Sequence, residues 1–438
     1  MAARWQSVGW ASAVMLLIGA HGGSSASAAD DGSGQAIVAI TVAADSCSQP
    51  DVQAAINAAS DGDTVEIPAG TCSWSAGVSF SKGIHLKGAD PGSVTLIHDA
   101  NSSYLLEVTE DNTHLTEISN LRFVEGTAAA DGHLAVYPGS HPVLVHDSYF
   151  ETNGGLLRAI RWVPNRGVIW GNEFSSNGQD DQAIVFVNNN DLQSWQTAST
   201  MGMDDLNGES NVYVEDNVFQ AIPLQTLDPD SNSRVVIRHN LFDESGLASH
   251  GADTSEYGTR HWELYDNIFT FTDYGDCDGS LTAGLNWFFY IRGGTGVITN
   301  NALPDISSCA WGDKTEIYMT VQNIRRNSGP YPCWTTYPVP HQVGQSHDGV
   351  SEVTEPVHIW GNTGGGVAGV GDFEPDECGN GETVTEYIEE GRDFVLGPKP
   401  GYVKFTYPHP LRTSLFADGF ESGDTTAWGA HSDSGSWL

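Results

Sequence analysis

The sequence has few positively charged residues for its length. Its 438 residues include 18 Lys and Arg against 56 Asp and Glu, so the formal net charge is −38 at pH 7. General binding to nucleic acid or to an anionic membrane surface depends on an excess of positive charge. The composition therefore excludes both roles and predicts that nucleic acid is not a partner.

Long apolar runs are also scarce. Residues 10–20 form an apolar run that is too short to span a membrane, which takes about 20 residues. Arg4 precedes this run, and the small residues Ala26-Ser27-Ala28 follow it in the pattern of a signal-peptidase site. We interpret residues 1–28 as a signal peptide and 29–46 as a leader. We expect a secreted protein, extracellular or periplasmic or on the cell surface, without membrane insertion.

The six cysteines lack the close CxxC spacing of zinc sites. In an exported protein, an even number of cysteines favours disulfide bonds over free thiols. We predict the pairs Cys47–Cys72, Cys277–Cys309 and Cys333–Cys378.

Several catalytic motifs are missing, namely the GxxxxGK phosphate loop, the HExxH zinc motif and the GxSxG serine elbow. What the chain does contain is 39% apolar residues, with 13 Trp, 14 Tyr and 16 Phe, and 50 glycines. Such a composition supports a folded core. At more than about 300 residues, the chain must form several domains or a repeat architecture whose core lengthens.

A short phrase recurs from residue 118 onward, with alternating apolar residues, then Asn or Asp, then an aromatic or aliphatic residue. Most steps between these phrases are 23 to 27 residues, a period typical of solenoids. The alternation indicates strands, and we expect the Asn to adopt the left-handed turn conformation and the following apolar residues to stack inward. The anchors are Asn120, Asp147, Asn172, Asn217, Asn240, Asn267, Asn301 and Asn362.

These repeats predict an all-β parallel β-helix over residues 47–363. The segment 51–60 places its apolar residues on one helical face and precedes the first strand, so we expect an N-terminal capping helix. Residues 364–414 should form a segment that caps the far end or packs along the flank. Residues 415–438 are interpreted as a flexible tail, and the whole protein as a monomer.

The segment DVQAAINAASDGDTVEIPAGTCSW (51–74) together with the Asn-anchored coils resembles the pectate-lyase-like, or pectin-lyase-like, proteins. The resemblance spans roughly residues 45 to 410 and implies a right-handed parallel β-helix solenoid. That superfamily includes uronan lyases, galacturonan hydrolases, esterases and adhesins, so the fold alone does not select a reaction.

The outward-facing residues of successive coils form a long face on which a polysaccharide can lie. Reading the alternation, we expect Val136, Ile184, Leu247 and Ile291 to point inward and Tyr137, Val185, His250 and Arg292 to point outward. The expected outward residues, together with those of the intervening coils, are Tyr137, Arg161, Val185, Gln225, His250 and Arg292.

Arginines are concentrated in the middle of this acidic chain. Nine of the 18 basic residues are arginines between residues 158 and 326, which suggests a site for an acidic ligand. The alternative is that these arginines only pair with neighbouring carboxylates. The nine are Arg158, Arg161, Arg166, Arg234, Arg238, Arg260, Arg292, Arg325 and Arg326.

We hypothesise a polysaccharide lyase that cleaves an acidic, uronate-containing polysaccharide by β-elimination. A base removes the proton next to the uronate carboxylate while cations neutralise that carboxylate. Candidates for the base and neutralisers are His250, Arg260 and Arg292; the resemblance makes the arginines eligible as base. Substrate contacts are expected from Tyr137, Arg161, Gln225 and Tyr290. The resemblance also implies bridging Ca²⁺, for which Asp180 and Asp181 are candidate ligands, although other acidic runs are equally suited.

Two alternatives remain open. The strings GQDD (178–181), SHG (249–251) and YIR (290–292) are similar to the QDD, GHG and RIK series of galacturonan hydrolases, which use paired carboxylates, here Asp180 and Asp181. The Asn-Thr-Asp string of those enzymes is absent one coil earlier, and the gap from Asp181 to His250 is too long. A non-catalytic adhesin would need the same coils and would bind sugars through exposed aromatic rings.

Overall fold

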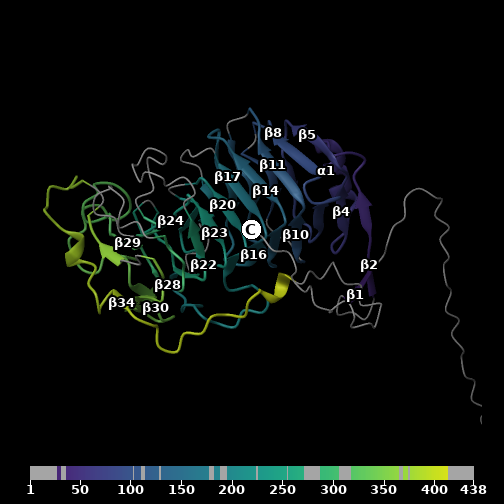
Figure 1. Ribbon diagram of the computed structural model, residues 1–438. Helices are drawn as coiled ribbons and strands as arrows, with labels where there is room; N and C mark the ends of the chain where they lie inside the picture. The colour runs from purple at the N-terminus through teal and green to yellow at the C-terminus, as the bar shows by residue number, and fades with distance from the viewer. Residues whose placement is uncertain are drawn as a thin grey trace, which may run out of the picture.

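The structure is a computed structural model that describes most of the chain from residue 36 to residue 412 (Figure 1). The described ranges are 27–30, 36–101, 103–109, 114–127, 130–176, 182–187, 195–222, 225–253, 255–270, 287–304, 317–364, 368–372 and 375–412. No helix within these ranges is long and apolar enough to cross a membrane.

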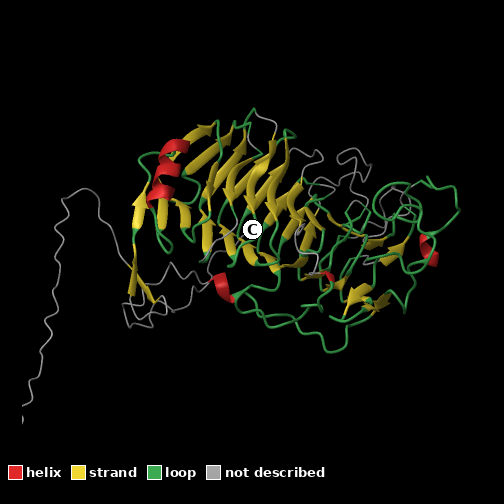
Figure 2. Ribbon diagram, turned by 180° about the vertical axis from the view of Figure 1, so that it is seen from behind, coloured by secondary structure: helices red, strands yellow, loops and turns green. Residues whose placement is uncertain are grey.

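The strands form parallel sheets along a coiled chain, and successive coils add neighbouring strands to the sheets on three sides of the coil (Figure 2). Sheet 1 has twelve strands: β3 Thr41–Ala43, β4 Thr64–Ile67, β7 His85–Gly88, β10 Thr116–Ser119, β13 Val143–His146, β16 Gly167–Trp170, β19 Val212–Glu215, β22 Arg234–Arg238, β25 His261–Tyr265, β28 Thr295–Thr299, β32 Val357–Trp360 and β34 Phe394–Leu396. Sheet 2 has eight: β5 Gly70–Trp74, β8 Val94–His98, β11 Leu121–Glu125, β14 Tyr149–Thr152, β17 Glu173–Ser176, β20 Val218–Gln220, β23 Leu241–Asp243 and β26 Ile268–Thr270.

A third side of the coil is shared by two shorter sheets. Sheet 3 contains β6 Val78–Phe80, β9 Tyr104–Val108, β12 Ala130–Val136, β15 Leu156–Trp162, β18 Gln182–Val187 and β21 Leu227–Asp230. Sheet 4 contains β24 Leu247–Ser249, β27 Phe289–Ile291, β29 Ile317–Met319 and β33 Ala368–Val370. The His250 N–H donates to the Pro229 carbonyl at 2.8 Å, so sheet 4 continues the direction of sheet 3.

Two small antiparallel pairs and three helical segments complete the described structure. The pairs are β1 Ser27–Asp30 with β2 Ala36–Ala39, and β30 Gln345–His347 with β31 Glu352–Thr354. The helical segments are α1 Gln49–Ala58 and the 3₁₀ turns η1 Val384–Glu386 and η2 Pro410–Arg412. The predicted right-handed parallel β-helix with an N-terminal helix is therefore confirmed.

The core is a column of apolar side chains that includes a stack of phenylalanines. The rings of Phe123, Phe150, Phe174, Phe219, Phe242 and Phe269 stack on one another with centroids 4.7 to 5.0 Å apart. Each ring is buried and comes from sheet 2 at the same register of successive coils. The inward aromatic column expected from the repeated phrase is thus present.

A ladder of buried asparagines closes the turn between sheets 1 and 2. In the middle of the ladder, the backbone N–H and the side-chain amide of Asn217 both donate to Oδ1 of Asn240, at 2.9 and 3.1 Å. Asn240 donates in the same way to Asn267, so each amide satisfies a backbone donor of the preceding coil. The ladder runs through Asn172, Asn217, Asn240, Asn267, Asn301 and Asn362.

In the later coils, the left-handed turn conformation falls one residue before the position that we expected. Asp216, His239 and Asp266, which precede ladder asparagines, have φ between 55° and 57°. In the earlier coils Asn120 and Asp147 themselves take this turn position, with φ of 58° and 49°. The two roles belong to neighbouring residues because the ladder side chain must point inward while the turn residue reverses the chain.

The helix α1 covers the open N-terminal end of the solenoid, as the apolar pattern predicted. Val52, Ala55 and Ile56 are buried against the core, and Pro50 stands in the first turn of the helix. The disulfide Cys47–Cys72 joins the start of this cap to β5, and this predicted pair is confirmed.

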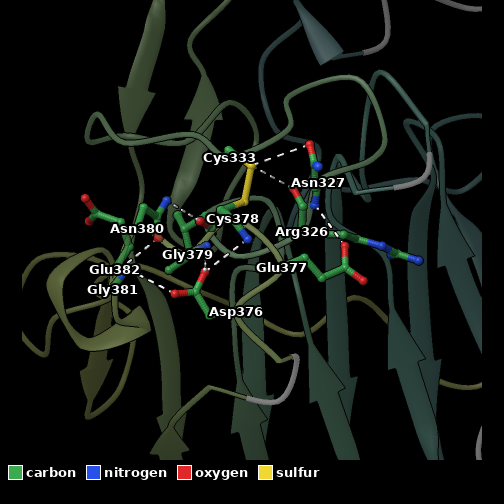
Figure 3. Close-up of a disulfide and its surroundings, with 11 residues drawn as sticks. Arg326, Asn327, Cys333, Asp376, Glu377, Cys378, Gly379, Asn380, Gly381 and Glu382 are labelled. Atoms are coloured by element: carbon green, nitrogen blue, oxygen red, sulfur yellow. Dashed lines mark hydrogen bonds between the residues drawn. A yellow bond between two sulfur atoms is a disulfide. The ribbon is translucent and has the colours of Figure 1, made fainter.

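The predicted disulfide Cys333–Cys378 is also confirmed, and it holds two long loops together near the far end of the solenoid (Figure 3). Nearby, the Asn327 N–H donates to Oε2 of Glu377 at 3.0 Å, which ties the same two loops. The third predicted pair, Cys277–Cys309, lies outside the described residues.

The chain beyond β34 runs back along the outside of sheet 1 (Figure 1). Its anchor is the buried Arg238 of β22, which donates to the carbonyls of Phe405 and Thr406 at 2.8 and 2.9 Å. Arg238 also forms an ion pair with the buried Glu215 at 2.7 Å, and Glu215 accepts the His409 N–H at 2.9 Å.

Candidate active site

A cluster of charged side chains lies on the outer face where sheet 3 meets sheet 4. Asp228 comes from β21, His250 directly follows β24, and Arg292 directly follows β27. Ser249 pairs with Ile291 in the register of sheet 4, so the residues that follow them, His250 and Arg292, are neighbours in adjacent coils. Ile184, Leu247 and Ile291 are buried in the core, as the alternation requires.

His250 is the centre of this cluster. Its Nε2 lies 3.0 Å from Oδ1 of Asp228, and its Nδ1 lies 3.8 Å from Oδ1 of Asp253. Burial and the nearby Arg292 lower the pKa of His250, but Asp228 and Asp230 outweigh them, so this pKa lies above its ordinary value of 6.5. The side chain keeps 12% of its surface exposed and is therefore reachable from the outer face.

Arg292 is a buried cation beside this histidine. Its Nη1 lies 2.9 Å from Oδ2 of Asp253, and its Nε donates to the Ser249 carbonyl at 2.9 Å. Burial lowers the pKa of Arg292 while Asp253 raises it, and the result is a pKa above the ordinary value. Arg292 therefore stays protonated, which suits neutralisation of a substrate charge and does not suit a base.

A second arginine, one of the nine in the arginine-rich part of the sequence but not among the candidate catalytic or substrate-contacting residues, reaches the same carboxylate. Nη1 of Arg326 lies 3.5 Å from Oδ2 of Asp253, and 31% of the Arg326 side chain is exposed. Its position depends on the loop that the Cys333–Cys378 disulfide holds, because the Cys333 N–H donates to the Arg326 carbonyl at 3.0 Å (Figure 3). Asp253 thus positions both arginines around His250.

The two preceding coils supply two carboxylates and two amides. Gln182 donates to Asp228 at 2.6 Å and to Gln225 at 3.0 Å, so Gln225 adjoins the cluster. Asp230 accepts from the Ser231 N–H at 2.6 Å and the Ser255 hydroxyl at 3.0 Å. Burial raises the pKa of Asp230, His250 lowers it and Asp228 raises it, with a net rise.

Of the expected substrate-contacting residues, Tyr290 lies beside the cluster and two others lie further along sheet 3. The Arg292 guanidinium sits over the Tyr290 ring at 5.2 Å, and this ring stacks on Trp287 at 4.1 Å. Arg161 pairs in register with Val185, and Val185 pairs with Asp228, so Arg161 is two coils from Asp228. Arg161 and Tyr137 are half-buried on the same face.

Arg260 is placed apart from the cluster. Its side chain is buried and donates to the carbonyls of Trp195, Thr197 and His347 at 2.8 to 3.1 Å. Burial lowers its pKa to about 10. These bonds hold the loop before β19 against the strand pair β30 and β31, which is a structural role. Asp180 and Asp181, the candidate calcium ligands, lie outside the described residues.

Comparison with solved structures finds alginate lyases. The chain is similar to the alginate lyase from Paenibacillus sp. str. FPU-7, with 14% identity over 60% of this chain and 94% of that one and a TM-score of 0.37. It is also similar to a variant of the PL6 family alginate lyase AlyGC, with 15% identity over 60% of this chain and 36% of that one and a TM-score of 0.37. The parent AlyGC is 13% identical over 60% of this chain and 39% of that one, with a TM-score of 0.32. No family model and no curated protein matches the chain.

Proposed function

We propose that this protein is a polysaccharide lyase that cleaves an acidic, uronate-containing polysaccharide by β-elimination, with His250 as the general base. The observation that supports this proposal is the arrangement of His250 on the outer face, with its Nε2 3.0 Å from Asp228 and with Arg292 and Arg326 beside it. The same residues suit the two tasks of the reaction, which are removal of a proton and neutralisation of a carboxylate.

The contact with Asp228 favours one tautomer of the neutral His250 imidazole, with the proton on Nε2. A neutral imidazole that carries its proton on Nε2 has its lone pair on Nδ1, the nitrogen that would then act as base. Nδ1 lies 3.8 Å from Oδ1 of Asp253. In the proposed reaction Nδ1 accepts the proton next to the uronate carboxylate, a carbon–carbon double bond forms, and the glycosidic carbon–oxygen bond breaks. The expelled oxygen takes a proton from solvent.

The arginines on this face supply the local positive charge that the chain as a whole lacks. Arg326 is exposed enough to contact a substrate carboxylate directly. Arg292 is buried next to it and would add positive charge below the bound carboxylate. Arg161 and Tyr137 extend the face along sheet 3 at about 4.8 Å per coil, where they would contact neighbouring sugars. The disulfides fit an oxidising, extracytoplasmic location for such an enzyme. We further propose that Asp180 and Asp181 are the residues that would hold a bridging Ca²⁺.

The second candidate is a glycoside hydrolase, and a specific observation favours it. A hydrolase of this kind needs paired carboxylates in the coil next to His250. Asp180 and Asp181 are too far from His250 in the sequence to lie there, but Asp228 and Asp230 do lie in the adjacent coil. The raised pKa of Asp230 suits a general acid, and Asp228 would be the partner that activates water.

The pH dependence separates the two reactions. A lyase needs unprotonated His250, so kcat/KM should rise with pH through a pKa above the ordinary value of 6.5. Asp228→Asn removes a charge and a bond that raise this pKa, so the rising limb should move to lower pH. The measurement is kcat/KM against pH for both proteins, with Asp243→Asn of sheet 2 as the matched control. An activity that instead falls as pH rises through this range would indicate an acid such as Asp230 and reject His250 as base.

A further inference from the structure

A second cluster of polar side chains lies on sheet 1, on different strands from the proposed active site. It consists of His85 on β7, Glu117 on β10 and His146 on β13, three successive strands. Nε2 of His146 lies 2.7 Å and Nε2 of His85 lies 3.4 Å from the same carboxylate oxygen, Oε1 of Glu117. One ligand atom from each residue lies within 4.8 Å of the other two.

The carboxylate at the centre is incompletely satisfied. The Glu117 side chain is 1% exposed, and its Oε2 is buried without a hydrogen-bond partner among the described residues. Leaving a buried carboxylate oxygen unpaired is unfavourable, because the oxygen has lost its hydration. A cation between the two imidazoles and this carboxylate would restore the missing interaction.

The two histidines are prepared as ligands in different ways. Nε2 of His85 lies 2.8 Å from the hydroxyl oxygen of Ser119, a contact that a bound cation would replace. Nδ1 of His146 lies 2.7 Å from Oδ2 of Asp147, and its ring stacks on Trp170 at 4.1 Å. A carboxylate on the far nitrogen is a common way to orient a metal-binding imidazole.

We propose that His85, Glu117 and His146 bind one divalent transition-metal ion of the zinc class, which clips three successive coils of sheet 1 together. Two imidazole nitrogens and one carboxylate oxygen form a donor set that suits zinc, whereas calcium and magnesium prefer oxygen ligands alone. The His85 and His146 side chains are 13% and 12% exposed, which leaves a path for the ion and a position for water. This site is independent of the proposed polysaccharide cleavage.

The test is zinc binding by the secreted chain, purified without a histidine tag and stripped with a chelator. We expect one zinc per chain by elemental analysis after dialysis, and a higher Tm with zinc than without it. His85→Ala and His146→Ala should weaken binding by at least the roughly 10- to 100-fold typical of changes around a metal ligand. Glu117→Gln keeps the shape of the side chain but removes its charge, and this variant should also lose the zinc-dependent rise in Tm. It therefore tests the site even if the alanine variants fold poorly.

The matched control is His114→Ala. His114 is 50% exposed and lies 3.3 Å from Asp61, so it is another histidine beside a carboxylate but belongs to a different group. This variant should bind zinc as the parent does. A parent that retains no zinc, cluster variants that bind as tightly as the parent, or a rise in Tm with calcium equal to that with zinc would each overturn the proposal.

Discussion

Replacing His250 with alanine should abolish the release of unsaturated sugar ends from the substrate. Loss of a positioned general base typically lowers the rate by about 10²- to 10⁴-fold. The effect should appear in kcat more than in KM, because Arg292, Arg326 and Tyr290 would still contact the polymer. The measurement is the initial rate of ultraviolet absorbance of unsaturated uronyl ends at saturating substrate.

The substitution should leave the fold intact. The His250 side chain faces the outer surface, and its backbone N–H still donates to the Pro229 carbonyl at 2.8 Å. Circular dichroism and Tm close to those of the parent would establish this. His114→Ala, with its exposed side chain, is the control that should keep full activity. A His250→Ala variant that turns over like the parent would show that the base is another residue. A protein that binds the polymer but releases no product would favour the adhesin alternative.

Replacing Arg238 with alanine should destabilise the protein by about 3 to 5 kcal/mol, the usual cost of removing one partner of a buried ion pair. The side chains of Arg238 and Glu215 are both fully buried, so the variant leaves the Glu215 carboxylate without its main cation. It also removes the hydrogen bonds to Phe405 and Thr406 that hold the C-terminal segment against sheet 1. The free energy of unfolding comes from denaturant titration, and limited proteolysis should show faster cleavage between residues 398 and 412.

Arg122→Ala provides the comparison for this effect. Arg122 pairs with Glu151 at 3.2 Å, but its side chain is 38% exposed. Exposed pairs contribute about 0 to 1 kcal/mol, so this variant should change the stability little. Equal losses for the Arg238 and Arg122 variants would contradict a dominant role for the buried pair in docking the C-terminal segment.

The repeated phrases predicted the fold because they fix local structure. The Phe that follows each Asn must point inward in every coil, and the stack from Phe123 to Phe269 is the direct consequence. The same phrases misplaced one detail, because Asn and Asp suit both the inward ladder and the left-handed turn. Asn120 and Asp147 occupy the turn, whereas Asn217 and Asn240 occupy the ladder.

The site was less accessible to sequence reasoning. Alternation within strands placed His250 and Arg292 on one face, because neighbouring coils share a register. It did not predict Arg326 or the part played by Asp253, which lie in long loops that return to the sheet. Nor did it predict that a loop would cover Arg260, since alternation shows which way a side chain points but not what packs over it.

The most direct test of the proposed function is product analysis on a panel of acidic polysaccharides. The chain from residue 29 onward would be incubated with each polymer, with and without calcium. Ultraviolet absorbance of unsaturated uronyl ends would be followed beside a reducing-end assay. The proposed lyase predicts that both signals rise together on one polymer. Reducing ends without absorbance would contradict β-elimination and favour hydrolysis by Asp228 and Asp230, and the absence of both signals would contradict cleavage of any polymer in the panel.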